Sequence, residues 1–68
     1  MELLTYQALI SHADNVNRVH AARDQIARIG GDVSIEPPNN LGLVLVTLRL
    51  PQGYSPEDIL PGIPFYPV

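Results

Sequence analysis

Glycine and proline divide this sequence into short segments, and each segment has room for only one or two elements. Seven of the 68 residues are proline and five are glycine. Proline cannot donate a backbone hydrogen bond inside a helix or sheet, and glycine favours turns and helix ends. The segment before Gly30 and Gly31 contains neither residue and is the longest. We therefore read the chain as a series of elements placed between these breaks.

The first segment predicts a strand followed by a helix. Residues 3–10 alternate in side-chain direction, and we assign the more continuous apolar face to the core. That face consists of Leu4, Tyr6, Ala8 and Ile10. After it, apolar residues recur at spacings of three and four up to Ile29, as in an amphipathic helix. They are Val16, Val19, Ala22, Ile26 and Ile29.

Local signals mark both ends of this helix. Ser11 followed by Asp14 fits a capping box, and Asp14 alone is the alternative cap. The Gly30-Gly31 pair ends the helix in the left-handed conformation. Two acid–arginine pairs four residues apart, Asp14 with Arg18 and Asp24 with Arg28, have the favourable orientation for surface ion pairs.

The rest of the chain predicts two strands, a short helix and a last strand. Residues 32–36 form a short strand that the following prolines end, and residues 41–50 form a long one. Ser55 and Pro56 begin a helix of one or two turns. Residues 63–68 form the last strand, which its prolines confine to a sheet edge.

The order of these elements predicts the fold class. A β-α-β-β-α-β sequence is typical of the α+β ferredoxin-like sandwich, with a four-stranded antiparallel sheet and two helices on one face. The first and third strands, which are the most apolar, take the centre of the sheet. We expect residues 1–68 to form a single domain of this kind.

Composition excludes several classes of function. The formal net charge is -3 and the chain has only four arginines and no lysine, so we expect no nucleic-acid binding. No apolar run is long enough to span a membrane. The first residues lack the basic segment of a signal peptide. We expect a cytoplasmic protein, unless the chain is a piece cut from a secreted precursor.

Catalytic and metal-binding patterns are weak. The chain has no cysteine, and its two histidines, His12 and His20, have no recognised ligand spacing. The acidic residues and serines have capping or surface roles. We therefore predict a protein that is not an enzyme and that uses no metal and no cofactor.

The sheet face that the helices leave open is the candidate site. A small monomer rarely exposes a large apolar surface to water, so we interpret this face as a protein-binding surface. The simpler alternative is a set of ordinary scattered surface hydrophobics. The residues that we expect there are Leu3, Thr5, Leu9, Leu43, Leu45, Thr47 and Tyr66.

Three short motifs along the chain carry a resemblance to a known family. The chain resembles the subtilisin-propeptide type of protease inhibitor over nearly its whole length. The residues that carry the resemblance are Gly30-Gly31-Asp32-Val33, Leu41-Gly42-Leu43, and Pro61-Gly62-Ile63 through Val68.

The resemblance implies a mechanism of binding without chemistry. The open sheet face would pack on two surface helices of a subtilisin-like serine protease, and Glu36 would cap those helices. The C-terminal segment would enter the protease cleft like a product. That segment here is Phe65, Tyr66, Pro67 and Val68. Members of the family act as inhibitors or intramolecular chaperones.

Two other hypotheses stay open at this point. The first is a self-associating structural module whose open sheet faces pair in a symmetric dimer. The second is a small-molecule-sensing regulatory domain that dimerises through the same face and binds its ligand near residues 11–14. The partner is therefore either a protease-like protein or another copy of this chain.

Overall fold

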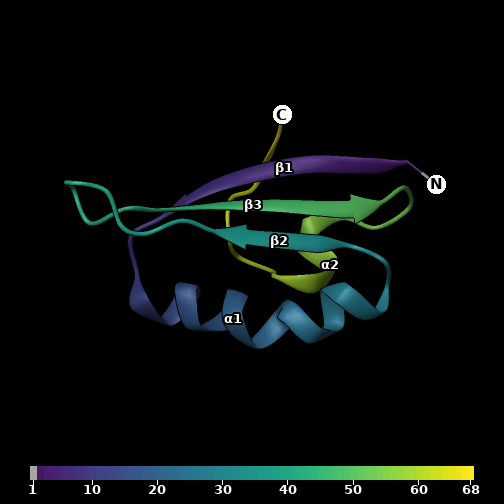
Figure 1. Cartoon of the computed structure of the whole chain (residues 1–68), viewed down its shortest axis with the longest axis horizontal. Helices are drawn as coiled ribbons and strands as arrows, with labels where there is room; N and C mark the ends of the chain where they lie inside the picture. Colours follow the sequence, from purple (N-terminus) through teal and green to yellow (C-terminus); the bar gives the residue numbers. More distant parts are fainter. Residues whose placement is uncertain (1) are drawn as a thin grey trace.

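The computed structural model describes residues 2–68 and is an α+β ferredoxin-like domain. Figure 1 shows one sheet with both helices on the same side of it. Its strand order is β2-β3-β1-β4, and every neighbouring pair is antiparallel. The elements are β1 (Leu3–Ile10), α1 (Ala13–Arg28), β2 (Asp32–Ile35), β3 (Val44–Pro51), α2 (Pro56–Ile59) and β4 (Tyr66–Pro67). The predicted fold class and the predicted places of the central and edge strands are confirmed.

The central pair of strands is the longest contact in the sheet. β1 and β3 pair over their full length, from Leu3 opposite Pro51 to Ile10 opposite Val44. β2 pairs with β3 through four residues, whereas β4 pairs with β1 only through Tyr66 and Pro67. The edge strands are therefore short attachments to one long ladder.

The core lies between the sheet and α1. Its buried residues alternate along the two central strands, as the period of a β-strand requires. α1 contributes its apolar stripe. The buried apolar residues are Ala8, Ile10, Val19, Ala22, Ile26, Val33, Val44, Val46, Leu48, Leu50, Leu60 and Ile63.

The predicted core face of β1 is wrong in one part. Leu4 is 38% exposed, although it shares a face with buried Ala8 and Ile10, whereas Tyr6 is partly buried and packs against the core. α2 has four residues, so it is only about 6 Å long. The helix layer therefore covers the start of β1 incompletely.

Two strand boundaries also differ from the prediction. β3 begins at Val44 rather than at residue 41, because the side-chain oxygen of Asn39 accepts hydrogen bonds from the backbone N–H groups of Leu41 and Leu43. β4 is limited to Tyr66–Pro67, because Ile63 is buried in the core and its carbonyl accepts a hydrogen bond from the Phe65 N–H in a tight turn.

The predicted cap of α1 is wrong. The N-cap residue is His12, and no side chain caps this end of the helix. Arg18 does not pair with Asp14, because its guanidinium donates to the carbonyl oxygen of Pro61 at 2.6 Å and to Asn15 at 3.4 Å. The expected pair of Asp24 and Arg28 is also absent from the ion pairs among residues 2–68.

The C-terminal end of α1 is as predicted, and it also lies close to the backbone of β3. Gly30 has a φ of 86°, and the N–H groups of Gly30 and Gly31 donate to the carbonyls of Ala27 and Ile26, as in a Schellman motif. A methyl group at residue 31 would lie 2.7 Å from the carbonyl oxygen of Arg49 in β3. Gly31 thus lets the end of the helix meet the sheet backbone.

We expect Gly31→Ala to lower the free energy of unfolding by about 1–3 kcal/mol, since the added methyl group overpacks this contact. Urea unfolding followed by circular dichroism measures the change. Gly42→Asn is the matched control, because nothing lies within 4 Å of a Cβ atom there and asparagine tolerates its positive φ. Equal stability of the Gly31→Ala variant and the native chain would contradict the close approach.

The predicted cap of α2 is confirmed. The Ser55 hydroxyl accepts a hydrogen bond from the Glu57 N–H, and the Asp58 carboxylate accepts one from the Ser55 N–H, both at 3.2 Å. This is a capping box with Pro56 in the first turn. The short helix is therefore held by local polar contacts as well as by packing.

Removal of the Ser55 hydroxyl tests this cap. We expect Ser55→Ala to cost about 1 kcal/mol of stability, whereas Ser11→Ala should change it by only a few tenths, because Ser11 caps nothing. Both values come from the same urea titration. A larger loss for Ser11→Ala than for Ser55→Ala would reverse the assignment of the two serines.

Candidate functional site: the open sheet face

The face of the sheet opposite the helices carries most of the residues expected there. Leu3, Leu9 and Tyr66 are between 40% and 51% exposed. Thr5, Leu45 and Thr47 are partly buried. The strand pairing places all six on the same side, because paired residues of neighbouring strands share a face. We name this surface the open face.

The open face also contains polar residues that the sequence-based site omitted. By the same pairing, they are Gln7, Asp32, Ser34 and Arg49. The alternation of residues along β1 and β3 was a sufficient signal for Gln7 and Arg49. Asp32 and Ser34 required the register between β2 and β3, which no local pattern provides.

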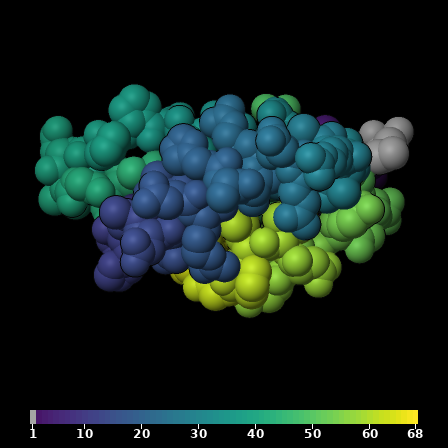
Figure 2. Space-filling model, turned by 90° about the horizontal axis from the view of Figure 1, so that it is seen from below, coloured from purple at the N-terminus to yellow at the C-terminus, as the bar shows by residue number. Residues whose placement is uncertain are grey.

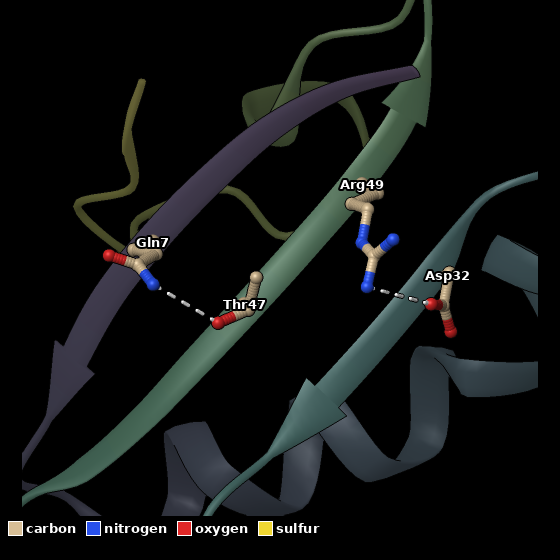
Figure 3. A network of polar contacts seen from close by, with 4 residues as sticks. All are labelled: Gln7, Asp32, Thr47 and Arg49. Atoms are coloured by element: carbon tan, nitrogen blue, oxygen red, sulfur yellow. Dashed lines mark hydrogen bonds and ion pairs between the residues drawn. The ribbon is translucent and has the colours of Figure 1, made fainter. Parts of the chain in front are cut away.

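These polar residues form a stripe across the middle of the face (Figure 3). The Gln7 side-chain amide donates a hydrogen bond to the Thr47 hydroxyl at 3.3 Å, and Ser34 lies opposite Thr47 on the other side. Arg49 reaches Asp32 on β2, with 3.8 Å between the charged groups. Both side chains of this ion pair are at least half exposed, so it adds little to stability.

Apolar side chains lie on either side of the stripe. Leu3 pairs with Pro51 at one end of the ladder, and Leu9 pairs with Leu45 toward the other. The open face therefore has one apolar area at Leu3 and another at Leu9 and Leu45, with polar groups between them. This arrangement offers hydrophobic contact and directional hydrogen bonding to one partner.

The other predicted partner-binding residues have different positions. Leu43 precedes β3 and is partly buried. Glu36 follows β2 and is exposed, and its N–H donates to the Leu45 carbonyl at 3.0 Å. Glu36 is thereby held beside the end of the open face that carries Leu9 and Leu45.

The C-terminal residues are part of the sheet. Phe65 packs against the core, and the backbone N–H of Val68 donates to the carbonyl of Thr5 at 3.0 Å. Pro67 pairs with Tyr6, which directs it to the helix side. The side chains of Tyr66, Pro67 and Val68 all stay exposed.

A hollow of about 300 Å³ lies at one end of the sheet, outside the open face. It is bordered by the link between β1 and α1, by the first turn of α1 and by the loop before β3. Figure 2 shows these parts at one end of the helix side. Its mainly apolar lining includes Ile10, His12, Val16, Pro38 and Val44.

The described residues contain no grouped set of ligands for a metal ion. In residues 2–68, no three histidine, aspartate or glutamate side chains lie close enough together to hold one. His12 and His20 are both exposed. The same part of the chain has no helix with the length and apolar character needed to cross a membrane.

Comparisons with models of known protein families, with curated proteins and with solved structures returned no match to this chain. The fold and the geometry of the open face are therefore the basis of the functional proposal below.

Proposed function

We propose that this chain is a protein-binding domain without catalytic activity, which docks on its partner through the open face. The observation that carries the proposal is the one-sided helix layer, which leaves Leu3, Leu9 and Tyr66 about half exposed on the opposite side. Removal of apolar side chains from water by a partner lowers the free energy of the complex. The polar stripe between them would orient that partner.

The resemblance to subtilisin propeptides supports a specific partner, a subtilisin-like serine protease. In that mode the two apolar areas would pack on surface helices of the enzyme. Glu36, held beside Leu45, would accept hydrogen bonds from a helix N-terminus of the partner, where a carboxylate is favoured. The domain would act as an inhibitor or folding chaperone by occupying the protease surface and cleft, without a chemical step.

The C-terminal segment would contribute through its exposed side chains. Tyr66 and Val68 are free to contact a partner, whereas Phe65 and the Val68 N–H anchor the segment to the domain. A rigid segment loses less conformational entropy on binding than a free one. Pro67 is exposed as well but shares the helix-side face with Tyr6, so we assign direct partner contacts in this segment to Tyr66 and Val68.

Leu9→Asp tests the open face. If the native chain inhibits a purified subtilisin in a chromogenic peptide assay, this variant should weaken inhibition at least tenfold, or about 1.4 kcal/mol, because it places a charge in an apolar contact. The matched control is Leu41→Asp, since Leu41 lies in the loop before β3 and is 82% exposed. Circular dichroism confirms that both variants fold.

The possible outcomes test the identity of the partner and the location of the binding surface separately. Absence of inhibition by the native chain would contradict a subtilisin as the partner. Equal inhibition by the native chain and Leu9→Asp would contradict the open face. Sedimentation of the native chain over a range of concentrations tests the competing dimer, which would dissociate on dilution and be lost in Leu9→Asp.

A second candidate function is the sensing of a small molecule. The hollow of about 300 Å³ supports it, because it lies beside residues 11–14, where this hypothesis expects the ligand. Its volume falls at the lower end of the range of known ligand pockets. Apolar walls would hold the body of such a ligand, and Ser11, His12 and Asn17 would supply polar contacts.

A thermal-shift assay with a panel of small metabolites tests this second candidate. A true ligand should raise the melting temperature of the native chain, and Ala13→Phe, which fills the hollow, should abolish the shift. Ala21→Phe is the control, because Ala21 is also exposed on α1 but does not line the hollow. No shift with any metabolite, or an equal shift in Ala13→Phe, would contradict it.

A further inference from the structure

β2 is an outer strand, and one side of its backbone has no strand beside it in residues 2–68. The Glu36 N–H donates to the Leu45 carbonyl of β3. In an antiparallel pair, alternate residues direct their N–H and C=O groups toward the partner strand. Asp32, Ser34 and Glu36 thus face β3, whereas Val33 and Ile35 direct theirs outward.

An unpaired strand edge of this kind is complementary to another extended chain. Val33 and Ile35 offer two N–H donors and two C=O acceptors in a row. Pro37 follows Glu36 and has no N–H, so this edge ends there. The accessible part of the edge is short and fits a peptide segment better than a long sheet.

Space for side chains exists beside the same edge. A hollow of about 210 Å³ lies between α1 and β2, which pack against each other with α1 below the strand in Figure 1. Its lining is Arg23, Asp24 and Ala27 from α1, followed by Gly31, Asp32 and Val33. An added strand directs alternate side chains toward the helix layer. One of them, opposite Val33, would enter this hollow.

Charge determines which peptide fits. Three carboxylates surround the edge: Asp24 at the hollow, Asp32 at the start of β2, and Glu36 just after its end. Within residues 2–68, Asp32 pairs with Arg49, whereas Asp24 and Glu36 form no ion pair. Arg23 is the one cation in the lining of the hollow. The surroundings of the edge thus favour a basic partner.

A second copy of this chain fits the edge poorly. The two-fold pairing that uses all four outward groups sets Val33 opposite Ile35 of the other copy. Asp32 then lies opposite Glu36 at both ends of the contact, and like charges directly opposite each other are destabilising. The repulsion disfavours a continuous sheet through two β2 strands.

We propose that the outer edge of β2 binds an extended, basic peptide segment of a partner protein as a fifth strand. Main-chain hydrogen bonds to Val33 and Ile35 supply the affinity. Asp24 and Glu36 select arginine or lysine side chains on the two faces of the added strand. This site lies at the edge of the sheet, and Glu36 is the one residue that it shares with the proposed docking through the open face.

The test uses a short fluorescein-labelled peptide of alternating arginine and threonine, whose binding to the full chain is measured by fluorescence anisotropy at low salt. Two control peptides have the same length: one carries glutamate in place of arginine, and one is N-methylated at alternate amides. We expect the basic peptide to bind, added salt to weaken binding, and each control peptide to bind at least about tenfold more weakly.

Variants of the chain localise the binding. Asp24→Asn and Glu36→Gln should each weaken binding about two- to fivefold, as exposed charge pairs do. Glu2→Gln makes the same change in net charge, but Glu2 precedes β1, which β3 separates from β2. This control should bind like the native chain. Equal losses of affinity in all three variants would mean that only the net charge of the chain affects binding, which would overturn the proposal.

Hydrogen exchange gives a readout at single amides. In the free chain, the Ser34 N–H should exchange slowly and those of Val33 and Ile35 quickly, and the basic peptide should slow the latter two at least about tenfold. Failure of the basic peptide to bind, or protection elsewhere than on β2, would overturn the proposal. Protection of Val33 and Ile35 that rises with chain concentration without peptide would identify a second copy and also overturn it.

Discussion

The register between β1 and β3 is the constraint on which the rest of the structure depends. Eight consecutive pairs join the two strands, and β2 and β4 are attached to the outside of this ladder. Because side chains alternate between the faces of a sheet, the register that buries Ala8 and Val46 also brings Gln7 and Thr47 together on the open face. A shift of this register by one residue would move the core side chains of one strand to the open face and its open-face side chains to the core. The core and the candidate site are therefore two consequences of one pairing.

The helix layer is attached to this ladder at defined points. Gly31 brings the end of α1 against the backbone of β3, and Arg18 connects α1 to the turn after α2 through the Pro61 carbonyl. Both contacts lie outside the open face, so neither restricts access to it. Among the parts of the sheet that stay accessible are the open face and the outer edge of β2. These surfaces differ in chemistry, since the open face offers apolar side chains and the edge offers unpaired backbone groups near carboxylates.

Two features that depend on near neighbours in the sequence were predicted correctly. The capping box of Ser55 and the end of α1 at Gly30 each involve residues a few positions apart. The cap of α1 and the surface pair of Asp14 and Arg18 were predicted wrongly. Arg18 instead donates to the carbonyl of Pro61, 43 positions away in the sequence. A local pattern of charges cannot predict a partner at that distance. In the candidate site, periodicity was enough for Leu3 and Leu9, but not for the ion pair of Asp32 and Arg49.

The sequence by itself determined the number, type and order of the elements, because alternation, helical spacing and the positions of glycine and proline are local properties of the chain. It also determined which strands could be central, since only β1 and β3 are long and apolar enough. The tertiary structure alone decided how the exposed residues combine. The polar stripe and the partial exposure of Leu4 arise where residues distant in sequence meet or fail to meet. Their positions depend on the register between strands and on the reach of the helix layer, which only the folded chain defines.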